Sequence, residues 1–172
     1  VFVEKPLVIG FDELAAVVAA HDRAVTQHAT LALMVGFNRR FAPHAVKARQ
    51  LLESIAEPKC LVMTVNAGAI PLKHWTQDQD AGGGRLIGEG CHFVDLMRFL
   101  VGAPIVDFEV RSIGKPVGGT CSDKFTLTMS FQDGSIGTLH YFANGHRSFS
   151  KERLEVFCAN RVLQLDNSRR MN

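Results

Sequence analysis

Long apolar runs, paired cysteines and blocks of like charge are all missing from this sequence. A helix needs about 20 consecutive apolar residues to span a bilayer, and the chain has neither such a run nor a basic leader followed by an apolar segment. A formal net charge of +2, spread along the chain, argues against a nucleic-acid partner. The cysteines are widely spaced, which argues against a disulfide framework or a zinc knuckle and favours reduced packing thiols: Cys60, Cys91, Cys121 and Cys158. We therefore expect a cytoplasmic protein with no membrane partner.

The histidines also lack the spacing of metal ligands. None of the seven histidines stands four residues from another, as two ligands on a zinc-binding helix would, and we expect no metal site. What the chain does have is enough apolar material for a core. With 172 residues, 47% hydrophobic and 21% charged, it can form one sizeable domain, or one domain and a piece of another.

The chain opens on an apolar strand, Val1 to Val3, followed by Glu4-Lys5-Pro6. A strand with nothing before it needs neighbours to pair its backbone, so we expect the sequence to be a fragment of a larger protein. Lys5 precedes proline, which favours an extended backbone, and it stands at a strand end, where open α/β sheets bind ligands. Two interpretations stay open for Lys5, a positioned catalytic ammonium or an exposed turn residue.

The pattern over the first forty residues predicts a strand, a helix over 12–27 and a second strand over 30–37. This order is typical of a crossover in a parallel sheet. Helices are then predicted over 41–55 and 88–100, with a strand over 59–67 between them. A long loop, 68–84, carries Trp75, the only tryptophan, and loops of this length are usually functional or disordered.

From residue 105 the apolar period changes to two, which predicts strands. Five are expected, over 106–113, 124–131, 135–142, 153–158 and 161–166. The predicted fold class is α+β, with a large, mostly antiparallel open β-sheet covered by helices on one face and preceded by a βαβ unit.

His92 is the second candidate for chemistry. It stands three residues before Asp95 on a predicted helix, so the two side chains share a face. A carboxylate there can fix the tautomer of the imidazole and raise its basicity, as a general acid or base requires. A lone helical histidine is more often structural, but the glycine-rich segment before it lets a ligand approach the backbone closely.

Three segments together resemble the Gfo/Idh/MocA oxidoreductases: Glu4-Lys5-Pro6, then Gly36-Phe37-Asn38-Arg39-Arg40-Phe41, then residues 82–95, which read GGGRLIGEGCHFVD. The resemblance covers nearly the whole chain. It implies an N-terminal Rossmann domain that binds NAD or NADP and a C-terminal domain that shapes a sugar site and forms oligomers. It also implies that residues 1–40 are the end of the Rossmann domain and residues 41–172 the substrate and oligomerisation domain. The glycine-rich nucleotide fingerprint would then lie upstream.

The same resemblance implies roles for individual residues. Lys5 matches the catalytic lysine that contacts the reacting hydroxyl, and His92 the histidine that moves its proton. Asn38, by the same resemblance, lies near the nicotinamide. We further expect Glu4, Lys5 and Pro6 to bind the cofactor, and Trp75, Arg85 and Asp95 to bind the substrate. We expect hydride transfer between nicotinamide and a sugar or nucleotide-sugar hydroxyl, and a homo-oligomer, such as a dimer, formed through the sheet face.

The sequence departs from the family at Gly88. Many members carry Asp four residues before the histidine, whereas here Gly88 is followed by Glu89. Either Glu89 takes over part of the catalytic role, or Lys5 and His92 act alone. A third alternative is a recognition or dimerisation domain of the same fold that no longer catalyses. We expect the fragment by itself to be inactive.

Overall fold

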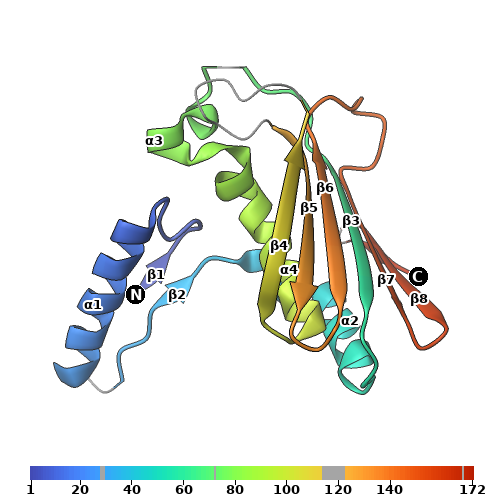
Figure 1. Cartoon of the computed structure of the whole chain (residues 1–172), viewed down its shortest axis with the longest axis horizontal. Coiled ribbons are helices and arrows are strands. Elements are labelled where there is room, and N and C mark those ends of the chain that lie inside the picture. The colour runs from blue at the N-terminus through green and yellow to red at the C-terminus, as the bar shows by residue number, and fades with distance from the viewer. Residues whose placement is uncertain (28–29, 72, 114–122, 168) are drawn as a thin grey trace.

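A computed structural model of the chain describes residues 1–27, 30–71, 73–113, 123–167 and 169–172. In residues 1–40, β1 (Phe2–Val3) pairs in parallel with β2 (Met34–Val35), and α1 (Phe11–Gln27) connects them (Figure 1). The predicted order is confirmed, but the strand expected over 30–37 is only two residues long. Within the described ranges each of these strands has a single neighbour, and an isolated strand pair is marginally stable. Helix α1 has no buried residue.

The rest of the chain builds a seven-stranded sheet in the order β4-β5-β6-β3-β7-β8-β9. Of its described strand pairs only β3 and β6 run parallel, so the prediction of a large, mostly antiparallel sheet is confirmed. The bounds of its strands are β3 Cys60–Asn66, β4 Ile105–Ser112, β5 Lys124–Phe131, β6 Ile136–Phe142, β7 Glu152–Cys158, β8 Arg161–Asp166 and β9 Arg170–Met171.

Two helices cover one face of this sheet, as expected (Figure 1). Helix α2 (Pro43–Glu53) begins with proline at its first turn, where the missing N–H costs nothing. Helix α4 (Cys91–Val101) ends at Gly102, whose φ of +80° is a left-handed conformation that suits glycine. Between the helices and the sheet lies one core, to which α4 contributes Phe93, Leu96, Met97, Leu100 and Val101.

Shorter elements differ from the sequence prediction. A 3₁₀ turn, η1 (Asn38–Phe41), precedes α2, and the loop 68–84 contains η2 (Trp75–Gln77) and α3 (Gln79–Gly82). Residues 86–90 form a π-helical turn, η3 (Leu86–Gly90), in which the Cys91 N–H reaches back five residues to the Leu86 carbonyl. π turns inside helices occur mostly at functional sites. The helix predicted over 88–100 is thus a π turn followed by an α-helix.

The opposite face of the sheet carries no helix among the described residues. Strand register places four apolar or thiol side chains in one row across four neighbouring strands. This open-face row consists of Ile136, Cys60, Phe157 and Val162, all of which are exposed.

Candidate functional site

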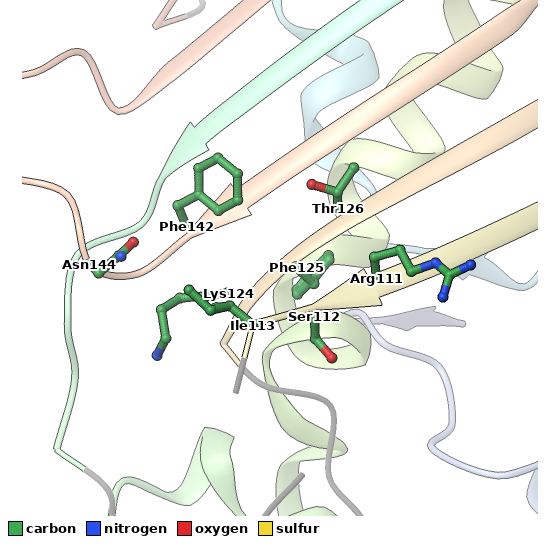
Figure 2. A pocket seen from close by; sticks show the side chains of 8 residues that line it. All are labelled: Arg111, Ser112, Ile113, Lys124, Phe125, Thr126, Phe142 and Asn144. Atoms are coloured by element: carbon green, nitrogen blue, oxygen red, sulfur yellow. The ribbon is translucent and has the colours of Figure 1, made fainter. Parts of the chain in front are cut away.

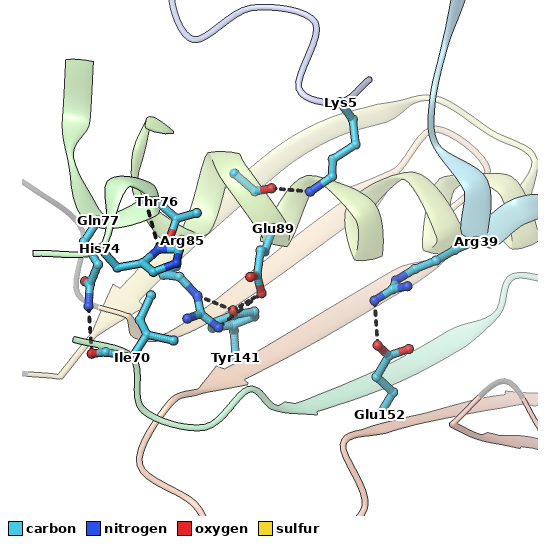
Figure 3. A network of polar contacts seen from close by, with 11 residues as sticks. Lys5, Arg39, Ile70, His74, Thr76, Gln77, Arg85, Glu89, Tyr141 and Glu152 are labelled. Carbon is cyan, nitrogen blue, oxygen red and sulfur yellow. Dashed lines mark hydrogen bonds and ion pairs between the residues drawn. The ribbon is translucent and has the colours of Figure 1, made fainter. Parts of the chain in front are cut away.

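Lys5 connects the N-terminal unit to the π turn. It stands just after β1, in a cis peptide bond with Pro6. Its Nζ donates a 2.5 Å hydrogen bond to the carbonyl of Gly88, 83 residues later (Figure 3). The two segments singled out in the sequence therefore meet, and the ammonium lies against the turn that leads into α4.

The other residues expected to bind a cofactor gather where β1 and β2 end. Because the strands are parallel, their carboxyl ends share one edge, which holds Glu4 and Asn38. A side chain at Gly36 would place its Cβ 3.0 Å from Glu4 Oε2, so glycine allows this close approach. Glu4, Pro6 and Asn38 thus stand at the edge where open α/β sheets receive their ligands.

His92 lies in the first turn of α4, and among the described residues its Nδ1 is buried without a hydrogen-bond partner. Phe37 meets the imidazole edge-on, with 6.3 Å between the ring centroids. Burial, together with the positive charges of Lys5 and Arg39, lowers the pKa of His92 to about 4 against the opposing carboxylates of Asp95 and Glu89. The imidazole is therefore neutral near pH 7 and able to accept a proton.

Among the described residues Asp95 makes no hydrogen bond to His92 Nδ1, so it does not fix the tautomer through that atom, although its negative charge acts to raise the pKa of the imidazole, as expected. Its carboxylate is bonded to Arg40 instead, with 2.9 Å between Arg40 Nε and Asp95 Oδ2 and a second contact between Arg40 Nη2 and Asp95 Oδ1. The planar fork of the arginine matches the two carboxylate oxygens. Asp95 therefore fastens α4 to the segment that follows β2. Substrate binding by Asp95 stays a prediction.

Arg39 is a residue that the sequence analysis did not single out. Its guanidinium lies over the ring of Phe93, 4.6 Å from the centroid. Its Nη2 donates to Glu152 Oε1 at 2.6 Å (Figure 3). These contacts join η1, α4 and β7 beside His92. No local pattern reveals this pairing, because Arg39 and Glu152 are 113 residues apart.

Glu89 belongs to a partly buried polar network with Arg85 and Tyr141, the only tyrosine (Figure 3). Tyr141 donates to Glu89 Oε2 at 2.5 Å, Arg85 Nη2 donates to the same oxygen at 3.1 Å, and Arg85 Nε donates to the tyrosine hydroxyl at 2.7 Å. The Arg85 side chain is only 3% exposed, so this network occupies the guanidinium. Arg85 remains a predicted substrate ligand, but direct contact would require the network to open.

Trp75 stands apart from these groups. Its side chain is 64% exposed, and its ring lies beside that of His74 at 6.0 Å between centroids. The structure holds its turn closely against the glycine-rich segment, since a Cβ on Gly82 would meet the Trp75 carbonyl oxygen at 2.6 Å. A Cβ on Gly83 would likewise meet Ile9 Cγ2 at 3.1 Å. Substrate binding by Trp75 stays a prediction.

A hollow of about 430 Å³ lies elsewhere, at the ends of β4, β5 and β6 (Figure 2). Its lining is Arg111, Ser112, Ile113, Lys124, Phe125, Thr126, Phe142 and Asn144, and none of the predicted site residues takes part. Within the described ranges, no three His, Cys, Asp or Glu side chains are placed to hold a metal ion, and no helix is long and apolar enough to cross a membrane.

Comparison with known proteins decides the family. A sequence model described as the GFO/IDH/MocA C-terminal domain matches residues 46–164. The chain belongs to the GFO/IDH/MocA family. Its relatives are oxidoreductases, and the resemblance of its motifs to that family is confirmed.

Two curated relatives of this GFO/IDH/MocA protein match it along almost its whole length. One is the uncharacterized oxidoreductase YrbE of Bacillus subtilis, 27% identical over 98% of this chain and 49% of its own. The other is the myo-inositol 2-dehydrogenase of Thermotoga maritima, 25% identical over 98% of this chain and 50% of its own. The chain spans about half the length of these relatives.

The same fold occurs in the solved structure of the WlbA dehydrogenase from Bordetella pertussis, determined in complex with NADH and UDP-GlcNAcA. That structure covers 99% of this chain with a TM-score of 0.80, and 54% of the WlbA chain is matched. At 15% identity the likeness concerns the fold.

Proposed function

We propose that this chain is the C-terminal part of an NAD- or NADP-dependent oxidoreductase that transfers a hydride between nicotinamide and a CH–OH group of a sugar or nucleotide sugar. The observation that carries the proposal is the bond from Lys5 Nζ to the Gly88 carbonyl, because it brings the ammonium to the turn that presents His92. Residues 1–40 would complete a Rossmann domain, and residues 41–172 would bind the substrate.

The residues at the edge of β1 and β2 fit a nicotinamide cofactor. Glu4, Pro6 and Asn38 stand at the carboxyl ends of two parallel strands, and the unpartnered Nδ1 of His92 faces no protein donor or acceptor among the described residues. A bound nicotinamide would supply the hydride acceptor or donor. The NADH and sugar nucleotide named for the WlbA dehydrogenase, and the inositol named for the Thermotoga relative, agree with this choice.

The protein residues would transfer the hydroxyl proton and stabilise the charge on the substrate oxygen. Neutral His92 takes the proton of the substrate hydroxyl in the oxidation direction and returns it in the reduction direction. The ammonium of Lys5 stabilises the negative charge that develops on that oxygen. Glu89 is exposed enough at the same turn to contact a neighbouring hydroxyl, since 37% of its side chain is accessible.

Nicotinamide absorbance, measured on the full-length protein with a panel of sugars and nucleotide sugars, tests this function. We expect turnover that Lys5→Met and His92→Ala reduce by about 100-fold or more, on the order of general acid–base effects, while cofactor affinity changes far less. Unchanged turnover in both variants would remove the two residues from the mechanism. Wild-type protein that turns over no substrate in the panel would favour the alternative of a recognition or dimerisation domain, which Gly88 supports.

The open sheet face supports a further part of the proposal, a homo-oligomer. The open-face row places exposed Ile136, Phe157 and Val162 beside one another on a face without described helices, and contiguous exposed apolar groups mark contact surfaces. We also propose the cytoplasm as the location, because Cys60, Cys91 and Cys158 are free thiols.

A further inference from the structure

In the network around Glu89, the side chain of Tyr141 is held in place by two contacts in addition to its hydrogen bonds. Tyr141 is fully buried, and its ring stacks on that of Phe125 at 5.0 Å with an interplanar angle of 4°. The guanidinium of Arg85 also lies over the tyrosine ring, 5.3 Å from its centroid. The ring of Phe125 and the buried guanidinium of Arg85 therefore fix the tyrosine whose hydroxyl contacts the carboxylate.

The direction of each hydrogen bond in this network is determined. Burial and the hydrogen bond to Glu89 raise the pKa of Tyr141, so its hydroxyl keeps its proton. Arginine has no acceptor, so Arg85 Nε donates to the hydroxyl, and the hydroxyl proton must point to Glu89 Oε2. Both donors converge on one carboxylate oxygen.

The other oxygen of Glu89 is left for a ligand. Among the described residues, only Oε2 accepts hydrogen bonds from Arg85 and Tyr141, while the side chain as a whole is 37% exposed. Glu89 also directly follows the carbonyl that Lys5 binds, so its carboxylate belongs to the same turn as the ammonium.

A side chain at position 88 would be crowded. A Cβ at Gly88 would lie 3.0 Å from the carbonyl oxygen of Gly82, closer than side chains normally come to backbone. An aspartate there would have to move the glycine-rich segment. Glu89 meets no such obstacle, and its longer side chain reaches Tyr141.

We propose that Arg85 and Tyr141 are positioning residues that hold the side chain of Glu89 as an acceptor for a hydroxyl of the sugar next to the reacting carbon. This inference rests on the proposed function, and it specifies the substrate as a polyol with a free hydroxyl, not an anionic group, at that position. Tyr141 and Arg85 act through Glu89 and do not touch the substrate themselves.

The test combines Tyr141→Phe, Glu89→Ala and the double variant in the full-length protein, with turnover measured against the sugar panel. Tyr141→Phe keeps the ring stack and removes only the hydroxyl. We expect it to lower kcat/KM about 10- to 100-fold, as small misplacements of a contact group do, and to leave the KM for cofactor unchanged. Because Tyr141 acts through Glu89, adding Tyr141→Phe to Glu89→Ala should cause no further loss.

Ser135→Ala is the matched control, since it deletes another buried hydroxyl just before the opposite end of β6. It should lower stability without changing kcat/KM. Equal losses when Tyr141→Phe is added to the wild type and to the Glu89→Ala variant, or no loss in either, would overturn the positioning role.

The outcomes separate this inference from the proposed function. If Lys5→Met and His92→Ala abolish turnover and Tyr141→Phe has no effect, the function stands and the inference is wrong. If no substrate is turned over, sugar binding is measured by calorimetric titration with the same panel. Binding that is weakened in both Glu89→Ala and Tyr141→Phe supports the inference. No binding of any sugar overturns the inference together with the function.

Discussion

Arg40 and Asp95, 55 residues apart, form a two-point ion pair that ties the segment after β2 to helix α4. The Asp95 side chain is only 10% exposed, and the Arg40 guanidinium also lies over the ring of Phe99, 5.4 Å from its centroid. The side-chain hydrogen bond to Asp95 raises the pKa of Arg40. The pair therefore fastens the first turns of α4, which carry His92, to the segment that follows β2.

Asp95→Asn should lower the free energy of unfolding by about 1.5–3 kcal/mol, the usual range for hydrogen bonds to charged groups. The pair between Arg49 and the exposed carboxylate of Glu53, at 3.7 Å, provides a control. Glu53→Gln should cost no more than about 0.5 kcal/mol, because solvent screens exposed i,i+4 pairs. Urea unfolding of both variants gives the comparison, and equal costs would contradict the anchoring role of Asp95.

The pH dependence of turnover should respond to Arg39. In the oxidation direction His92 must be neutral, so the rate falls as pH drops through a pKa of about 4. Removing the positive charge in Arg39→Met should raise that pKa toward its ordinary value of 6.5, and the acidic limb of kcat/KM should move to higher pH.

Arg39→Met leaves the carboxylate of Glu152 without its partner, so the pH profile is also measured in Arg39→Met/Glu152→Gln. The double variant removes both charges of the Arg39–Glu152 pair, so no carboxylate is left unpaired, but the cation beside His92 is still missing. We expect the acidic limb of kcat/KM to move to higher pH by the same amount as in Arg39→Met. A limb that stays in place in both variants would show that Arg39 does not set the protonation of His92.

Gly82→Ala should disturb the loop that carries Trp75. Its Cβ would meet the Trp75 carbonyl oxygen at 2.6 Å and Thr76 Cα at 2.7 Å, and backbone atoms cannot move aside as a flexible side chain does. We expect a loss of about 1–3 kcal/mol in unfolding free energy, typical of overpacking, and a higher KM for substrate. Gly10→Ala meets no atom within 4 Å and serves as the control in the same calorimetric and kinetic measurements.

The elements with strong local patterns could be predicted from the sequence. The core strand β5 and the strand β8 lie at the residues expected, because alternating apolar positions define a half-buried strand. The π turn before His92 could not be anticipated in this way, since glycines at 88 and 90 permit several backbone paths. The short helix after Trp75 has too few residues to produce a helical period.

In the candidate site, too, residues in local sequence motifs could be predicted, whereas contacts made only by the folded sheet could not. Lys5 and His92 stand in recognisable local motifs, whereas Tyr141 reaches Glu89 across 52 residues and only after β6 has paired within the sheet. One signal was available in the sequence. A tyrosine that alternates with core positions in a strand must find a partner for its hydroxyl, and Tyr141 follows Leu139 in this way.

The open-face row predicts the oligomeric state. Ile136 is 49% exposed and pairs in register with Cys60, which in turn pairs with Phe157. If this face forms the contact between subunits, Ile136→Lys buries an unpaired ammonium there and should turn an oligomer into monomers. Leu51→Lys makes the same exchange at an exposed position on α2, on the helix-covered side of the sheet, and should leave the assembly intact. Sedimentation velocity of the full-length protein distinguishes the two, and a monomeric wild type, or an oligomer that survives Ile136→Lys, would rule out this face as the interface.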